Sequence, residues 1–151
     1  MIPRKIVVCT DFSENSVPAR IVATDYAKIF KAELLILHVV NSRLIGYPGF
    51  AAKPPVDLAA IEENIRQGVA EELELLANDV RREMEDVRAY SRSGAPAEEI
   101  VRFADEVSAD LIVMGTHGWT GMRHLILGST AENVVRSAHC QVLTVRSEGK
   151  T

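Results

Sequence analysis

Residues 110–130 read DLIVMGTHGWTGMRHLILGST, an apolar run followed by a loop that contains four glycines. The apolar run 110–114 predicts a strand that is buried on both faces of a parallel sheet. Glycines let a loop turn its N–H groups toward one centre, and such a concavity binds anions. A segment with helical spacing begins at Ser129, and the first N–H groups of a helix also favour phosphate. The stretch from Gly115 to Thr130 therefore predicts a phosphate-binding loop between a strand and a helix.

The same residues also allow an interpretation without a ligand. Ser129 and Glu132 have the S-x-x-E spacing of a capping box, in which two side chains satisfy N–H groups at the start of a helix. Isolated glycines also occur in ordinary turns. Two other nucleotide-binding patterns are absent from the sequence: the G-x-x-x-x-G-K-[ST] loop, and G-x-G-x-x-G after the first strand.

Apolar runs and helix-period segments alternate outward from this loop to both ends of the chain. Strands are expected at Lys5–Cys9, 34–40, 87–93, 110–114 and Gln141–Val145, and helices at 16–30, 58–84, from Pro96 onward, and at 129–138. This order predicts one α/β domain over residues 1–151, with helices on both faces of a doubly wound, five-stranded parallel sheet. Right-handed crossovers leave two strand orders, the Rossmann-like 3-2-1-4-5 and the flavodoxin-like 2-1-3-4-5.

The spacing of small and apolar residues predicts the buried face of two of these helices. For the first helix the predicted face comprises Ala19, Val22, Ala23, Tyr26, Ala27 and Phe30. For the helix that opens at Pro96 it comprises Ala97, Ile100, Ala104 and Val107. Residues 41–55 contain three prolines and two glycines and predict a long loop, a kind of element that often serves as a lid or binding loop.

The position of the glycines favours one strand order. In a doubly wound sheet, ligands bind beyond the carboxyl ends of the strands, at the point where the strand order reverses. In order 3-2-1-4-5 this point lies between strands one and four, with Cys9, Thr10 and Asp11 on one side and Met114 and Gly115 on the other. The loop after strand four is rich in glycine, whereas the loop after strand one has none, which favours order 3-2-1-4-5.

Composition argues against several classes of protein. The net charge is −4 and basic and acidic residues are interleaved, so we expect no nucleic-acid partner. No apolar run approaches the roughly 18 residues of a membrane helix, so we expect no membrane partner. The first apolar run is short and ends before Asp11, unlike a signal peptide, and a cytoplasmic protein is expected. Cys9 and Cys140 have no metal-ligand spacing, and strand four would separate them too widely for a disulfide.

Three separated motifs resemble those of the universal stress protein family. The pattern Gly115-x2-Gly118-x9-Gly128-Ser129 matches the family's ATP-binding motif. The opening segment 8–13, VCTDFS, looks like the family's first strand and turn, and His38-Val39 looks like the end of its second strand. The resemblance covers nearly the whole chain. It implies strand order 3-2-1-4-5, ATP as the bound cofactor with or without Mg²⁺, and a homodimer formed by antiparallel pairing of strand five, from Val142 to Val145.

The resemblance also implies which residues bind the nucleotide. Asp11 would face the ribose, or a metal beside the phosphates, and the main chain near Cys9 and Val39 would contact the adenine. The loop after strand four would wrap the ribose and phosphates, and the start of the next helix would hold the phosphates. The implied ATP-binding residues are Cys9, Thr10, Asp11, Val39, Met114, Gly115, Thr116, His117, Gly118, Trp119, Thr120, Gly121, Gly128, Ser129, Thr130 and Ala131.

Three functions follow from this interpretation, and a fourth is disfavoured. The first is an ATP-binding regulator or switch of the stress response with little or no turnover, since no catalytic base stands beside the predicted phosphate site. The second is a slow ATPase or self-phosphorylating protein, in which Asp11 would hold a metal and Ser129 or Thr130 would accept phosphate. The third is a dimeric protein-interaction module without nucleotide turnover. A phosphoacceptor receiver domain is disfavoured, because Asp11 has no acidic neighbour and Arg146 follows strand five in place of the expected lysine.

Overall fold

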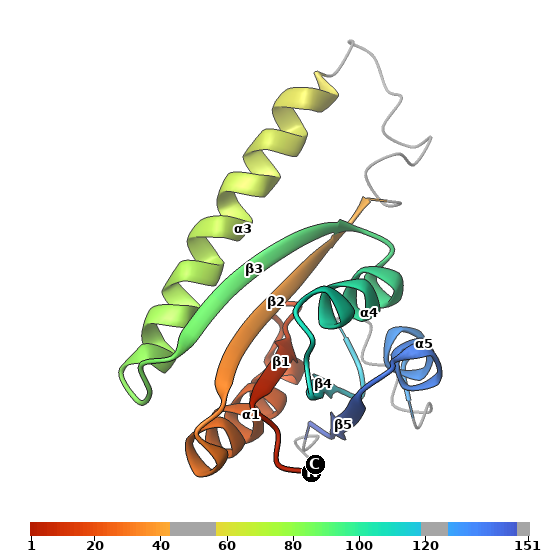
Figure 1. Ribbon diagram of the computed structural model, residues 1–151. Coiled ribbons are helices and arrows are strands. Elements are labelled where there is room, and N and C mark those ends of the chain that lie inside the picture. The colour runs from red at the N-terminus through yellow and green to blue at the C-terminus, as the bar shows by residue number, and fades with distance from the viewer. Residues whose placement is uncertain (43–56, 119–126, 148–151) are drawn as a thin grey trace.

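The structure is a computed structural model that describes residues 1–42, 57–118 and 127–147. One parallel sheet lies between two layers of helices (Figure 1). The strands have the order β3-β2-β1-β4-β5. Their bounds are β1 Lys5–Cys9, β2 Glu33–Asn41, β3 Val87–Gly94, β4 Leu111–Gly115 and β5 Gln141–Val145. The predicted doubly wound α/β sheet and the order 3-2-1-4-5 are both confirmed.

The three central strands are buried because they carry continuous apolar runs. In β1 and β4 the side chains of Ile6, Val7, Ile112 and Val113 have no exposed surface. Successive residues of a strand point to opposite faces, so these runs supply two cores at once. One core lies under α1 (Val17–Phe30), which follows the short helix η1 (Glu14–Ser16), and under α3 (Leu58–Arg81). The other core lies under α4 (Pro96–Glu106) and α5 (Ser129–Ser137).

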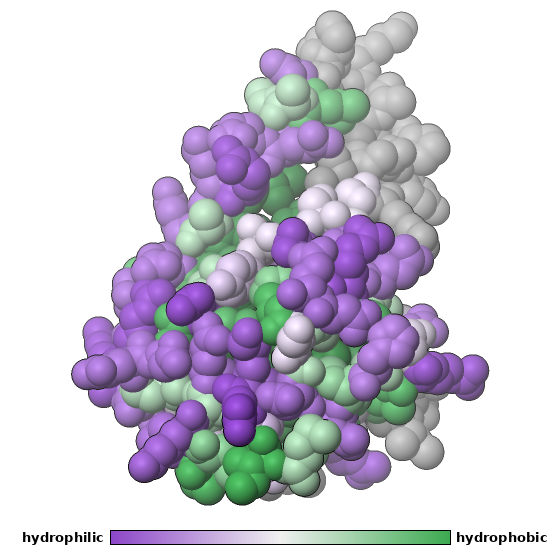
Figure 2. All heavy atoms as spheres, viewed as in Figure 1, coloured by the Kyte–Doolittle hydropathy of each residue, from purple (hydrophilic) through white to green (hydrophobic). Residues whose placement is uncertain are grey.

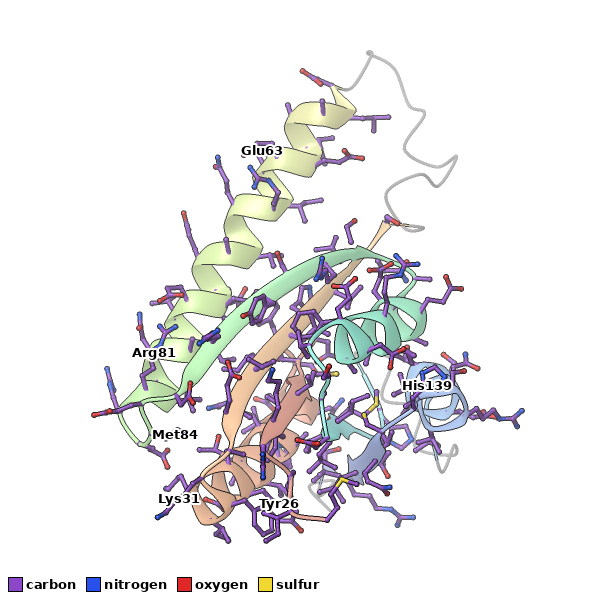
Figure 3. All side chains as sticks on the ribbon, in the orientation of Figure 1. Tyr26, Lys31, Glu63, Arg81, Met84 and His139 are labelled. Atoms are coloured by element: carbon purple, nitrogen blue, oxygen red, sulfur yellow. The ribbon has the colours of Figure 1, made fainter. Side chains whose placement is uncertain are left out.

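The helix α3 is longer than the part of the sheet that it covers. Its buried residues, Leu73, Ala77 and Val80, all belong to its C-terminal half. Figure 3 shows Arg81 beside the start of β3, where its Nε donates to the carbonyl of Val87 at 3.3 Å, and Glu63 far along the helix. The helix ends at Arg81, three residues before the predicted end. None of the helices in the described parts of the chain is apolar over enough turns to cross a bilayer.

The observed cores correct two of the predicted helix faces. Ala19, Ala23 and Ala27 are buried as expected, but Tyr26 and Phe30 are each 37% exposed. Small residues let α1 approach the sheet closely, which leaves the two larger rings beside the contact, where they pack edge to face with centroids 5.7 Å apart. In Figure 2 hydrophobic side chains gather along the lower edge, where α1 lies in Figure 1. The prediction for α4 omitted Phe103, which is 1% exposed and packs against Tyr90 of β3.

The strand register creates a notch above the end of β1. Pairing of β1 with β2 ends at Cys9↔Leu37, followed by one bond from the N–H of Thr10 to the carbonyl of Leu37 at 2.9 Å. Pairing of β2 with β3 continues to Asn41↔Gly94. The last residues of β2 therefore extend past β1, with β4 on the other side of the notch. This is the point at which the strand order reverses, and where ligands bind in such sheets.

Candidate functional site

A cavity of about 560 Å³ lies at this reversal point. Its volume is within the roughly 300–1,000 Å³ of small-molecule sites. Thirteen of the residues predicted from the sequence line it together: Cys9, Thr10, Asp11, Val39, Met114, Gly115, Thr116, His117, Gly118, Gly128, Ser129, Thr130 and Ala131. The remaining predicted residues, Trp119, Thr120 and Gly121, lie outside the described part of the chain, as do most of residues 41–55.

The N-terminus of α5 opens into this cavity without a side-chain cap from the described residues. The N-cap residue is Gly128, and Ser129 is already the first helical residue, so the predicted capping box is wrong. Glu132 pairs instead with Arg136, at 2.9 Å. The N–H of Glu132 makes the first helical hydrogen bond, to the carbonyl of Gly128 at 2.9 Å. The N–H groups before it have no partner within a helix and can bind a ligand. Partly positive N–H groups at a helix start attract phosphate.

Close packing leaves little room for a side chain at two glycines of this loop. A Cβ atom on Gly128 would lie 3.1 Å from the carbonyl oxygen of Thr116, and one on Gly118 would lie 3.0 Å from Oδ2 of Asp11. The N–H of Gly128 donates to the same Thr116 oxygen at 2.7 Å. The Asn15 side chain donates from Nδ2 to the carbonyl of Gly118 at 3.0 Å. The glycine loop therefore packs directly on itself and on the turn after β1.

Thr116 anchors the start of this loop in the sheet. Its N–H donates to the carbonyl of Val145, at the end of β5, at 3.0 Å. Its Oγ1 lies 3.0 Å from Nδ1 of His117. Since its carbonyl also accepts from Gly128, Thr116 ties together the end of strand five, the glycine loop and the start of α5.

The turn after β1 directs the carboxylate of Asp11. Its Oδ1 accepts from both the N–H and the hydroxyl of Ser13, the N–H at 3.0 Å. Its Oδ2 lies toward Gly118, as the close approach to that residue shows. One carboxylate oxygen therefore fixes the turn and the other faces the glycine loop across the notch.

The edge of β2 supplies a donor and an acceptor to the opposite end of the cavity. The carbonyl of Leu37 points toward β1, because it accepts from the N–H of Thr10. The N–H and C=O of one strand residue point to the same side, and the residue two positions on repeats that direction. The N–H and C=O of Val39 therefore point into the notch where β1 has ended, and Val39 lines the cavity.

Several lining residues were not predicted from the sequence: Ser16, Leu37, His38, Val40, Asn41, Ile65, Val69, Pro96 and Ile100. Nδ1 of His38 lies 2.8 Å from the carbonyl oxygen of Thr10, and His38 also forms part of the wall. Ile65 and Val69 lie on the apolar stripe of α3, and only the packing of that helix brings them to the cavity.

Cys9 lines the cavity as a neutral thiol. Burial raises its pKa from 9.0 to about 12, and burial also raises the pKa of the half-buried Cys140. Both cysteines are free, as expected. The described residues contain no group of three or more His, Cys, Asp or Glu side chains placed to hold a metal.

The raised pKa predicts that Cys9 resists alkylation. At pH 8 a thiol with a pKa near 12 carries about a thousandfold less thiolate than one near 9. Iodoacetamide at pH 8 should therefore modify Cys9 at least about tenfold more slowly in the folded protein than in urea, as followed by peptide mass spectrometry. Alkylation of Cys9 in the folded protein at the rate measured in urea would show that burial does not raise the pKa of the Cys9 thiol in this way.

Relatives of this chain include proteins seen with bound nucleotides. The chain is 38% identical over 148 residues to a universal stress protein of Methanocaldococcus jannaschii, with 97% of this chain and 84% of the relative covered. It resembles the crystal structure of a universal stress protein in complex with cAMP, with 29% identity, a TM-score of 0.68, and 97% and 98% of the two chains covered. It also resembles the Archaeoglobus fulgidus universal stress protein in complex with dAMP, with 25% identity, a TM-score of 0.65, and 97% and 100% covered.

A family model matches this chain over almost its full length. A model of the universal stress protein family matches residues 3–146, which include all five strands and the whole of the described cavity wall. Together with the 38% identity to the archaeal relative, this match shows that the chain belongs to the universal stress protein family.

Proposed function

We propose that this protein binds ATP in the cavity at the reversal point and acts as a nucleotide-dependent regulator of the stress response. The observation that carries the proposal is the N-terminus of α5, which opens into the cavity without a side-chain cap from the described residues. A glycine loop that allows close backbone approach leads into this helix end. Related structures that hold cAMP and dAMP support an adenine nucleotide as the ligand.

The edge of β2 favours adenine over guanine. Adenine presents an acceptor at N1 beside a donor at its exocyclic amine, which fits the N–H and C=O of Val39. Guanine presents a donor at N1 beside an acceptor at O6, the reverse order. Bound in the same place, guanine would leave polar groups unpaired, which costs about 1–3 kcal/mol per buried group. The proposed base site therefore selects adenine through the main chain.

The opposite end of the cavity suits the phosphates and ribose. Phosphate oxygens would accept from the first N–H groups of α5 and from the hydroxyls of Ser129 and Thr130. Asp11 would accept from ribose hydroxyls or hold the Mg²⁺ that accompanies a triphosphate. The carboxylate oxygen that faces Gly118 lies on the side of the glycine loop, where the ribose and phosphates would bind.

Little turnover is expected, because the titratable lining residues of the described chain already have other roles. Asp11 accepts from Ser13, and His38 is bonded to the carbonyl of Thr10. Nδ1 of His117 lies beside Thr116, and burial raises the pKa of Cys9 to about 12. A binding role with slow or no hydrolysis fits these contacts better than a dedicated enzyme.

A cytoplasmic homodimer completes the proposal. In the described chain, β5 pairs only with β4, and its residues from Val142 to Val145 are half-buried. An exposed edge strand with apolar side chains favours pairing with another strand. Antiparallel pairing of two copies of β5 would cover it, and Thr116 would then connect the dimer interface with the phosphate loop through its bond to Val145.

Calorimetric titration with ATP and with GTP tests this proposal. We expect one ATP per chain, and at least about tenfold weaker binding of GTP, which corresponds to about 1.4 kcal/mol. Absence of ATP binding at millimolar concentration would contradict the proposed function, whereas equal affinity for both nucleotides would contradict the base site at Val39. Incubation with labelled ATP and Mg²⁺ separates the alternatives, because phosphate release or label on Ser129 or Thr130 above the level of an Asp11→Ala variant would indicate an enzyme.

A further inference from the structure

The turn after β1 contains a residue in an uncommon conformation. Phe12 has φ 63°, in the left-handed region that bulky side chains rarely adopt. A residue persists there only when its surroundings hold it, and such positions cluster at functional sites. Phe12 directly follows Asp11, so the conformation of one residue sets the direction of the other.

Two kinds of contact hold Phe12 in place. Its N–H donates to Oγ1 of Thr10 at 3.0 Å, and that hydroxyl lies 3.1 Å from Oγ of the buried Ser16. Its ring packs against the imidazole of His38, with the ring centroids 4.4 Å apart and the planes inclined by 32°. One contact is polar and local, and the other comes from the end of the neighbouring strand.

His38 holds the turn through a hydrogen bond as well. Its Nδ1 lies 2.8 Å from the carbonyl oxygen of Thr10. A carbonyl only accepts, so Nδ1 carries the proton in this bond. The bond lies just beyond the last backbone bond between β1 and β2, from Thr10 to the carbonyl of Leu37. His38 therefore extends the connection between the two strands after their ladder has ended.

These contacts hold the residues on either side of Asp11 in the sequence. His38 bonds to Thr10, the residue before Asp11, and packs on Phe12, the residue after it. We propose that His38 is a positioning residue that holds the Asp11 carboxylate toward the glycine loop, an inference that rests on the proposed nucleotide site for its functional meaning. The two contacts of His38 are separable, since one requires a donor and the other requires a ring.

The role differs from that of a histidine that only stabilises the core. A core histidine contributes to the free energy of unfolding, but its replacement changes nucleotide affinity in the same way whether or not Asp11 is present. A positioning histidine acts through Asp11, so the effects of replacing the two residues are not additive.

The first measurement uses the protein without nucleotide. Amide hydrogen exchange of Phe12 and Ser13 reports the turn directly, because both N–H groups are bonded within it. We expect His38→Phe, which keeps the ring and loses the donor, to accelerate both exchanges at least about tenfold relative to Ile112 in the core. His38→Asn, which keeps a donor near the position of Nδ1, should restore part of the protection. His139→Asn, at an exposed histidine that pairs with Asp105, serves as the control. Unchanged exchange in both His38 variants would overturn the inference.

The second measurement is a cycle of ATP affinities over four proteins: unsubstituted, His38→Phe, Asp11→Ala, and the double variant. We expect His38→Phe to weaken ATP binding about tenfold when Asp11 is present and less than about twofold in the Asp11→Ala background. An equal loss in both backgrounds would overturn the positioning role. If His38→Phe does not fold, the same cycle with His38→Leu, which also removes the donor, decides the matter.

The two measurements separate this inference from the proposed function. If the unsubstituted protein does not bind ATP, the proposed function fails, and the amide exchange alone decides whether His38 holds the turn. If ATP binds but the His38 variants do not change amide exchange at Phe12 and Ser13, the proposed function stands and the positioning role is wrong.

Discussion

Gly128→Val is expected to weaken ATP binding at least about a hundredfold, or about 2.7 kcal/mol. The new Cβ would lie 3.1 Å from the carbonyl oxygen of Thr116, which also accepts the N–H of Gly128 at 2.7 Å. The backbone fixes the position of the Cβ and the Thr116 oxygen is a backbone atom, so rotation of a side chain cannot relieve the close contact. The start of α5 or the glycine loop must then shift by a few tenths of an ångström, which moves the first N–H groups of α5 relative to the phosphates. Calorimetric titration with ATP measures the effect.

Gly68→Ala is the matched control for this substitution. Gly68 lies in the middle of α3, and a Cβ there would meet no atom within 4 Å. We expect ATP affinity to stay unchanged and the free energy of unfolding to rise by about 0.5–1 kcal/mol, because alanine loses less backbone entropy in a helix. If Gly128→Val keeps full ATP affinity while the control behaves as expected, the start of α5 does not take part in ATP binding.

Asp11→Ala is expected to weaken binding of Mg²⁺-ATP roughly 10- to 100-fold, in line with about 1.5–3 kcal/mol for hydrogen bonds to a charged group. The substitution removes the oxygen that faces Gly118 and the acceptor that orders Ser13. The Asp11→Ala substitution also removes a negative charge and so reduces repulsion of the phosphates. A second titration without Mg²⁺ separates this effect from the loss of a metal ligand. If Asp11 holds the metal, the loss should be smaller without Mg²⁺.

Glu14→Ala provides the control for the loss of an acidic side chain near the same turn. Glu14 is exposed in η1 (Glu14–Ser16) and does not line the cavity. It should leave ATP affinity within about twofold of the unsubstituted protein, since exposed charges interact weakly through water. An equal loss for Asp11→Ala and Glu14→Ala would point to net charge, and not to a contact made by Asp11, as the cause.

The sheet could be predicted from the sequence because its order follows from two simple signals. Buried parallel strands carry continuous apolar runs, and the glycine loop marks the strand beside the reversal point. The helix faces were predicted less well. The predicted face of α4 omitted Phe103, although this ring packs beneath Tyr90 and Arg92. The predicted face of α1 included Tyr26 and Phe30, which remain at the surface because α1 lies close to the sheet.

Within the candidate site, residues on the loops after the strands were predictable, whereas its walls were not. The capping box was wrong by a single residue: the helix begins at Ser129, so Ser129 cannot act as its own N-cap. Sequence spacing does not fix a helix start to one residue. Ile65 and Val69 reach the cavity only because α3 projects past the sheet, a consequence of packing that no local pattern encodes.

The conformation of Phe12 also had no signature in the sequence. Its positive φ depends on the His38 ring, which belongs to another strand, and on the hydroxyl of Thr10. The resemblance places His38 at the end of the second strand, but nothing in the sequence indicates its bond to the residue before Asp11. Contacts between distant segments set the direction of this carboxylate.

A crystal structure of the protein grown with ATP and Mg²⁺ would show directly whether the cavity at the reversal point holds the nucleotide. We expect density for one nucleotide per chain, with the adenine edge at the main chain of Val39 and the phosphates at the first N–H groups of α5, after Gly128. A nucleotide bound at another surface, or an empty cavity in crystals from a saturating ATP solution, would contradict this expectation.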